Sequence, residues 1–318
     1  MTEEPVPHWP GRPIDVGDHQ VYVRSTPGDG EPAHKEAALC VHGLAGSSRN
    51  WTDLMDLLRP RLACDALDLP GFGDSPPRPD GRYSIAAFAQ TVAALIEHRN
   101  RGPVHLIASS LGGAVAVNLA AARPDLVRTL TLISPALPAS RPGRDEAEFA
   151  LLGLPRLGPR LLRRYEALPP QNRVADVITT CYHDPARFPP ARFATEVTEL
   201  ARRDTLPYAT AALAGSVRAL TAEFFRRAGW RDARRITAPA LVLYGSHDRV
   251  VDPRMAGRAA RAFAGARIVV LPRTGHLAHM EHPAQVAAEI DVLLAGIPGP
   301  ARRLMVGQDG VHEARSVP

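Results

Sequence analysis

One stretch decides the fold of this chain: Val104-His105-Leu106-Ile107-Ala108-Ser109-Ser110-Leu111-Gly112-Gly113-Ala114-Val115-Ala116. A short apolar run ends at a serine, two glycines follow, and an alanine-rich helical pattern comes next. This order predicts a strand, a sharp turn and a helix, with Ser110 at the apex of the turn. Such a turn lifts the serine hydroxyl above a sheet and points the next backbone N–H at the reacting oxygen. We expect Ser110 to have a positive φ, a strained conformation typical of functional sites.

The turn departs from the usual pattern of a nucleophilic serine at one position. The pattern is A-x-S-x-G instead of G-x-S-x-G, because Ala108 replaces the first glycine. Ser109 is the alternative nucleophile, but Gly112 stands two residues after Ser110 and fixes the register there. Taken alone, the stretch also fits a structural turn, so the rest of the chain has to decide.

The composition places the chain among large globular proteins. It has 318 residues, a hydrophobic fraction of 45% and a charged fraction of 22%, which are ordinary values for a soluble domain with a large core. The formal net charge is +5. The arginines are spread along the chain, whereas nucleic-acid binding requires a clustered positive surface, so we expect no nucleic-acid partner.

Three cysteines, at positions 40, 64 and 181, have no C-x-x-C spacing that would indicate a metal or redox pair. Cys40 and Cys64 lie in apolar runs, and an odd number of core thiols fits a reducing compartment. The first thirteen residues contain acidic residues and prolines but no apolar core of a signal peptide. We therefore expect a cytoplasmic protein without membrane insertion, metal or cofactor.

Strand and helix patterns alternate along most of the chain. A hairpin is predicted over 14–25, and short apolar runs bounded by turn residues predict strands over 37–41, 62–67, 104–108, 127–133, 240–244 and 267–271. Helical spacing predicts helices over 47–58, 84–98, 111–122, 254–264 and 283–295. This alternation predicts an α/β fold with a parallel sheet and helices on both faces.

The alternation is interrupted once, by a segment with helical patterns and no convincing strand. We therefore predict a first core part over 1–136, a helical cap inserted over 137–232 and a second core part over 233–298. Residues 299–318 are rich in glycine, proline and charge, and predict a flexible tail.

Two further side chains fall where a serine nucleophile needs them. Asp248 follows the strand predicted at 240–244, and His276 follows the strand predicted at 267–271. The carboxyl ends of parallel strands meet at one edge of a sheet, so both side chains are expected near Ser110. Imidazole takes the proton of a weakly nucleophilic hydroxyl, and a buried carboxylate fixes the imidazole tautomer. The chain order serine, acid, histidine is that of one hydrolase fold.

The turn after the first buried strand supplies candidate main-chain donors. We expect the backbone N–H groups of Leu44 and Leu111 to form an oxyanion hole. The leucine side chains are expected to shape the substrate pocket, for which the further candidates are His42, Gly43, Trp51 and Ser109. Two of these have a structural alternative: His42 as an organiser of the loop through hydrogen bonds, and Trp51 as a core residue.

Several nearby residues have plainer interpretations. Asp252 is the alternative to Asp248, but it is expected to cap the following helix. His279 and His282 are the alternatives to His276, but they fall in a loop or at a helix start. In the cap, His183 and Asp184 predict a surface loop, and paired arginines such as Arg202-Arg203 are expected to be solvated.

Taken together, these motifs resemble the α/β-hydrolase superfamily in its single-cap serine hydrolase branch. The resemblance covers roughly 14–136 and 233–297 and is carried by His42-Gly43-Leu44, Asp68-x-Pro70-Gly71-Phe72-Gly73-x-Ser75, the elbow at 108–112, Gly245-x-x-Asp248, and Gly275-His276 followed by Glu281-x-Pro283. It implies an eight-stranded, mostly parallel sheet with a helical lid. Related dehalogenases and epoxide hydrolases carry Asp at the elbow, so Ser110 argues against those activities.

The resemblance leaves the substrate open. We expect a carboxylic ester hydrolase that acts on a small acyl or ester substrate through an acyl-enzyme. A carbon–carbon bond hydrolase of vinylogous diketones would use the same triad. A ligand receptor on the same scaffold is a third interpretation, because fold alone does not define activity. The oligomeric state stays open, with a homodimer among the possibilities.

Overall fold

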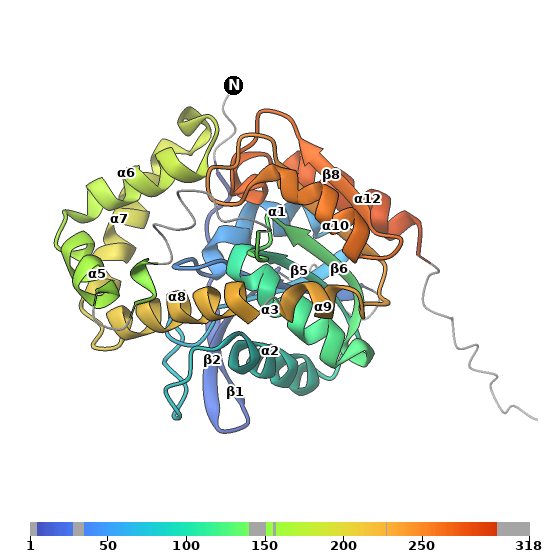
Figure 1. The fold of residues 1–318 in the computed structure, drawn as a ribbon, viewed down its shortest axis with the longest axis horizontal. Helices are drawn as coiled ribbons and strands as arrows, with labels where there is room; N and C mark the ends of the chain where they lie inside the picture. The colour runs from blue at the N-terminus through green and yellow to red at the C-terminus, as the bar shows by residue number, and fades with distance from the viewer. Residues whose placement is uncertain (1–4, 28–34, 140–150, 155–156, 227, 298–318) are drawn as a thin grey trace, which may run out of the picture.

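The computed structural model describes residues 5–27, 35–139, 151–154, 157–226 and 228–297. The predicted tail at 299–318 and part of the predicted cap therefore lie outside the described residues. Figure 1 shows a central sheet flanked by helices, with a group of helices to one side of it.

The sheet has eight strands in the order β1-β2-β4-β3-β5-β6-β7-β8. In chain order the strands are β1 (Gly11–Val16), β2 (His19–Ser25), β3 (Glu36–Val41), β4 (Leu62–Leu67), β5 (Val104–Ser109), β6 (Val127–Ile133), β7 (Ala240–Gly245) and β8 (Arg267–Leu271). Only β2 runs antiparallel to its neighbours, β1 and β4, and the other neighbouring pairs are parallel. The predicted fold class, a mostly parallel eight-stranded α/β-hydrolase sheet, is confirmed.

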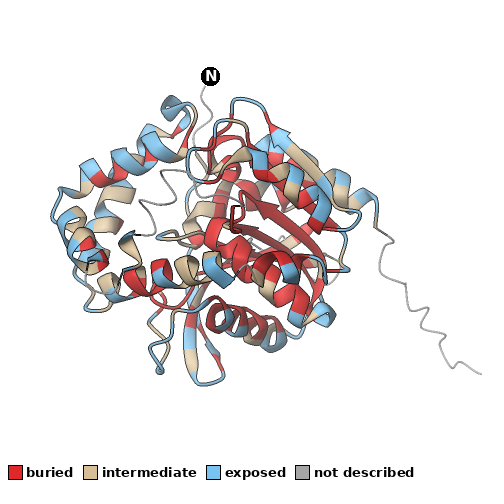
Figure 2. Ribbon diagram, viewed as in Figure 1, coloured by how far each residue is buried: buried red, intermediate tan, exposed pale blue. Residues whose placement is uncertain are grey.

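Both faces of the sheet are covered by apolar side chains. Leu39 and Val41 of β3 belong to one buried cluster, and Ala38 and Cys40, which alternate with them, belong to the other. The first cluster is closed by α2 (Ile85–Arg99), α3 (Ser110–Ala122), α9 (Ala228–Ala233) and α10 (Ala256–Ala262), and the second by α1 (Thr52–Leu58), α11 (Ala278–Glu281) and α12 (Pro283–Ala295). Burial on both faces explains why these strands are continuously apolar, and Figure 2 shows the central strands buried.

Four described helices between β6 and β7 extend to one side of the sheet, and the last of them also packs on the core, where Ala212 is buried in the first cluster. They are α5 (Gly158–Glu166), α6 (Pro170–Cys181), α7 (Pro190–Asp204) and α8 (Ala209–Arg226), and we call them the cap helices. Val174 and Ile178 of α6 form a third apolar cluster with Tyr182 and Phe188, which lie between α6 and α7, and Leu277 and Met280 pack against it. No strand occurs among the described residues between β6 and β7. Helices α6 and α7 and the segment between them thus have a small core of their own, which contacts the loop after β8 and α11.

Helix ends follow the local sequence signals. The Ser84 side chain accepts a hydrogen bond from the N–H of Ala87 and caps α2, as the sequence predicts. The helix predicted at 47–58 is divided into a 3-10 turn (Ser48–Trp51) and α1.

None of the described helices is long and apolar enough to cross a membrane.

Candidate active site

Ser110 is the first residue of α3, directly after β5, and has a φ of 50°. The predicted positive φ is confirmed. The two glycines that follow allow close backbone packing. A Cβ at Gly112 would lie 2.3 Å from the carbonyl oxygen of Val41, and one at Gly113 would lie 2.8 Å from Cβ of Pro135. Larger residues would push α3 away from β3 and from the loop after β6, so these glycines hold the serine turn in place.

The loop after β3 lies against Ser110. A Cβ at Gly43 would approach Cβ of Ser110 to 3.0 Å and its Oγ to 3.6 Å. The residues that carry the two proposed oxyanion donors, Leu44 and Leu111, directly follow Gly43 and Ser110 in the chain. The Leu111 side chain is fully buried in the core, and Leu44 packs partly against the same cluster. Packing, and not pocket shape, is therefore the visible role of the Leu111 side chain.

His42 holds this loop through both ring nitrogens. Nδ1–H donates to the carbonyl of Gly43 at 2.7 Å, and Nε2 accepts from the backbone N–H of Leu69 at 2.9 Å. This pattern fits a neutral ring, and burial lowers the pKa of His42 to about 4. The hydrogen bonds match the expected loop-ordering role. The ring is fully buried, which argues against direct contact with substrate.

Asp248 and His276 meet at the carboxyl ends of β7 and β8. His276 Nδ1 lies 2.9 Å from Asp248 Oδ2, and the two side chains are 5% and 0% exposed, respectively. Asp248 Oδ1 accepts the backbone N–H groups of Val250 and Val251, both at 2.8 Å. Burial opposes ionisation of Asp248, but the charge of His276 and these hydrogen bonds outweigh it and lower the pKa of the carboxyl. The carboxylate is thus fixed with one oxygen on the imidazole.

The end of β6, which lies between β5 and β7, connects the Ser110 turn to the strand that precedes Asp248 through backbone hydrogen bonds. The N–H of Ala136 donates to the carbonyl of Ser110 at 2.9 Å, and the N–H of Ser134 donates to the carbonyl of Leu243 at 2.8 Å. Within the described ranges, no hydrogen bond joins Ser110 Oγ to His276. Catalytic hydrogen bonds of a free enzyme often close only in the substrate complex.

The other candidate residues occupy structural positions. The Trp51 ring is fully buried and stacks on the His279 ring, with 4.3 Å between centroids, so it packs in the core as the alternative interpretation expected. Ser109 is buried at the end of β5. Asp252 accepts the N–H of Arg254 and caps the next helical turn, and His282 directly precedes α12. Among the described residues, no group of three or more His, Cys, Asp or Glu side chains could hold a metal ion.

The carboxylate of Glu281 connects the cap helices to the histidine loop. Its side chain is 0% exposed and accepts backbone N–H groups from Gly275 at 2.7 Å, Asp184 at 2.9 Å and His183 at 3.2 Å. The N–H of His276 itself donates to the carbonyl of Cys181 at 2.7 Å. The prediction of a plain surface loop at His183 and Asp184 is therefore incomplete. Although both side chains are at least partly exposed, their backbone is bonded beside His276.

Replacing Glu281 with glutamine is expected to lower kcat of the hydrolysis that the sequence predicts by about 10–100-fold, with little change in KM. The amide offers one oxygen to three donors, and each buried N–H left unpaired costs about 1–3 kcal/mol, which frees the loop that carries His276. Steady-state kinetics well below the melting temperature would measure the effect.

The matched control is Glu289→Gln, at an exposed ion pair with Arg267 far along α12. Its kinetics are expected to match the wild type. Wild-type kcat in Glu281→Gln, or an equal loss in both variants, would show that Glu281 does not position His276.

Comparison with known proteins links this geometry to one family. The family described as alpha/beta hydrolase fold matches residues 38–283. A pimeloyl-[acyl-carrier protein] methyl ester esterase from Neisseria meningitidis is 30% identical over 253 residues, which cover 78% of this chain and 88% of that protein. The acetyltransferase component of the acetoin cleaving system of Pseudomonas putida, a dihydrolipoyllysine-residue acetyltransferase, is 29% identical over 248 residues. These residues cover 77% of this chain but only 60% of that protein, which is less than two thirds of its length.

A solved structure shares the same architecture. The 2-hydroxy-6-oxo-6-phenylhexa-2,4-dienoate hydrolase from Rhodococcus sp. strain RHA1 superimposes with a TM-score of 0.74 at 21% identity, over 90% of this chain and 98% of that chain. At this level of identity the likeness concerns the fold alone.

Proposed function

Because the chain belongs to the alpha/beta hydrolase family, we propose that it hydrolyses a carboxylic ester through an acyl-enzyme formed on Ser110. The observation that carries the proposal is the buried pair of His276 and Asp248, at the same edge of the sheet as the positive-φ turn of Ser110. The similarity to a methyl ester esterase supports the ester as the bond that is cleaved.

In this mechanism Ser110 Oγ attacks the ester carbonyl carbon while His276 Nε2 takes the hydroxyl proton. The negative charge moves to the carbonyl oxygen, which accepts the backbone N–H groups of Leu44 and Leu111. The tetrahedral intermediate collapses, and the protonated His276 gives its proton to the departing alcohol oxygen. Asp248 keeps the proton on Nδ1, which leaves Nε2 free to accept one.

A water molecule then hydrolyses the acyl-enzyme by the same series of steps. His276 removes a proton from the water, the hydroxide attacks the acyl carbon, and Ser110 Oγ leaves with the returned proton. The carboxylic acid product departs and the free enzyme is restored. The proposed mechanism needs no cofactor, and we propose that the cap helices α5 to α8 cover the site and limit the entry of bulk water.

Initial rates on p-nitrophenyl esters from acetate to laurate test the proposal. We expect turnover with an optimum at one acyl length, and labelling of Ser110 by a fluorophosphonate. If the fluorophosphonate labels Ser110 but no ester is cleaved, a vinylogous diketone becomes the substrate to test, because carbon–carbon hydrolysis uses the same triad. If neither labelling nor cleavage occurs while a ligand still binds, the chain is a receptor and the proposal fails.

A further inference from the structure

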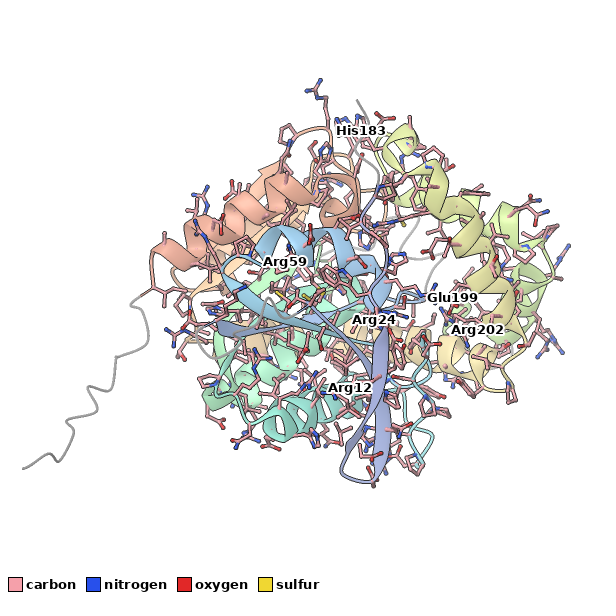
Figure 3. All side chains as sticks on the ribbon, turned by 180° about the vertical axis from the view of Figure 1, so that it is seen from behind. Arg12, Arg24, Arg59, His183, Glu199 and Arg202 are labelled. Atoms are coloured by element: carbon pink, nitrogen blue, oxygen red, sulfur yellow. The ribbon has the colours of Figure 1, made fainter. Side chains whose placement is uncertain are left out.

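One side of cap helix α7 carries charged residues toward the core. Arg192, Glu196, Glu199 and Arg203 follow one another at spacings of three or four residues, which places them on one helix face. The first three each meet a charged or ionisable core residue, and these partners are Asp53, His8 and Arg49, respectively. Figure 3 shows Glu199 and Arg202 beside Arg24, and both arginines bind Asp74. The contact of α7 with the core is therefore largely ionic and paired.

Arg203 differs from the other members of this face. In the part of the chain that the structure describes, no ion pair involves its guanidinium. Nη1 donates to the carbonyl of Ala45 at 2.9 Å, and Cζ lies 5.4 Å from the centroid of the Phe72 ring. Burial lowers the pKa of Arg203, although the group stays protonated at any physiological pH. The prediction of a solvated pair is wrong for Arg203, which is a partly buried cation.

The Arg203 guanidinium lies against the loop after β3, next to the proposed nucleophile. Ala45 follows Gly43 by two residues, a span of at most about 7 Å, and Gly43 packs against Ser110. Phe72, under the guanidinium, contacts the edge of the His42 ring, with 5.8 Å between the ring centroids. Arg203 thus brings a positive charge from the cap to the oxyanion side of the proposed site.

The guanidinium also keeps unused hydrogen-bonding capacity. Arginine has five N–H donors in a planar fork, and among the described residues the guanidinium of Arg203 makes a single hydrogen bond, to Ala45. The fork matches the two oxygens of a carboxylate. The carboxylates of Glu199, Asp68 and Asp204 act on this partly desolvated cation, but none of them forms a direct ion pair with it in the described residues, so a carboxylate bound in the fork would still be stabilised. Arg192, Glu196 and Glu199 each form an ion pair within the protein, whereas Arg203 forms no direct ion pair among the described residues and can pair with a ligand.

We propose that Arg203 binds a second carboxylate on the acyl chain of the substrate, so that the enzyme prefers monoesters of dicarboxylic acids. This inference rests on the proposed ester hydrolysis and adds the substrate class to it. The rival interpretation is that Arg203 only fixes the loop at Ala45. The two differ in one respect: a loop-fixing arginine serves charged and neutral esters equally, whereas a carboxylate-binding arginine serves only the charged ones.

Two esters of equal chain length separate these interpretations. Mono-4-nitrophenyl adipate and 4-nitrophenyl hexanoate differ only in a terminal carboxylate in place of a methyl group. We expect wild type to prefer the adipate and Arg203→Gln to lose about 10–100-fold in kcat/KM on the adipate, the worth of a charge-assisted hydrogen bond. Activity on the hexanoate should stay within about twofold. Arg203→Lys, which keeps the charge but loses the fork, should show a smaller loss.

The control is Arg202→Gln, which removes the same charge from the adjacent position, where the arginine is paired with Asp74 and Glu199. It should keep the wild-type preference. Equal losses on both esters in Arg203→Gln, or no preference for the adipate in wild type, would overturn the inference.

A binding measurement keeps the test independent of turnover. If wild type cleaves neither ester, the proposed function fails, and calorimetric titration with free adipate then decides about Arg203. Binding that is lost in Arg203→Gln but kept in Arg202→Gln supports the carboxylate site. Equal binding by all three proteins, or no binding at all, rejects it.

Discussion

The Ser110→Ala variant is expected to lose about 10⁴–10⁶-fold in kcat on any ester that the wild type cleaves. The methyl group has no electron pair with which to attack the carbonyl, and no other group takes its place, so the covalent route closes. Substrate binding and the oxyanion donors remain, and a small residual rate above that of water is expected. The variant should fold normally, because alanine fits a helix start and fills the same space without the hydroxyl.

The measurement pairs initial rates with active-site labelling. Wild type should react with a fluorophosphonate at one residue, and Ser110→Ala should not react. The control is Ser109→Ala at the neighbouring position, whose hydroxyl is buried and has no hydrogen-bond partner among the described residues. This variant should stay within a few-fold of wild type. Loss of activity and labelling in Ser109→Ala but not in Ser110→Ala would show that Ser109, and not Ser110, is the nucleophile.

The second large effect is expected for Asp248→Asn, a loss of about 10⁴-fold in kcat. Both carboxylate oxygens accept hydrogen bonds, one from His276 and the other from the N–H groups of Val250 and Val251. An amide can accept only through its oxygen. Its NH₂ group must then face either the imidazole, which favours the wrong tautomer, or the backbone donors.

Asp252→Asn provides the matched control, because Asp252 only caps the following helical turn. Asparagine caps helices about as well as aspartate, so activity and stability should change little. If Asp252→Asn abolishes turnover while Asp248→Asn keeps it, the acid has been misassigned.

The same carboxyl gives a pH-dependent signature in stability. Its pKa in the folded protein is lower than the ordinary value of about 3.9. Its contribution to the free energy of unfolding is therefore fully present above pH 4 and is lost as the pH falls through the folded-state pKa. The difference in unfolding free energy between wild type and Asp248→Asn should shrink from pH 7 to pH 3. Urea unfolding at both values would measure it, and a constant difference would contradict the lowered pKa.

The sheet could be predicted because its strands carry an unusual local signal. Runs such as 37–41 and 240–244 are apolar at every position, and the structure buries both faces of β3 and β7. Helix α12 was predictable at both ends, from Pro283 to the glycine after Ala295. The short helix α11 was missed, since four residues are too few for a helical period to show.

The candidate triad could be proposed because Ser110, Asp248 and His276 all lie within five residues of a strand's carboxyl end, the edge at which α/β sheets place their sites. Contacts across long distances in the chain could not be predicted. The Glu281 carboxylate accepts the backbone N–H groups of His183 and Asp184. Almost every residue has a backbone N–H, so the sequence carries no signal for which of them a distant carboxylate will bind. Arg203 could not be told from a surface arginine in the sequence, since the absence of a direct ion pair among the described residues depends on which charges the fold brings near it.

The order of the strands has a consequence for when the protein can act. The proposed nucleophile ends β5, whereas its acid and base follow β7 and β8, which pair with the sheet only after the cap helices have been made. These pairings join residues far apart in the chain, and such contacts form late and slowly. A chain still leaving the ribosome can therefore already carry the serine in its elbow while it lacks the histidine proposed to activate it. Under the proposed mechanism, hydrolysis is expected only after the last two strands have docked.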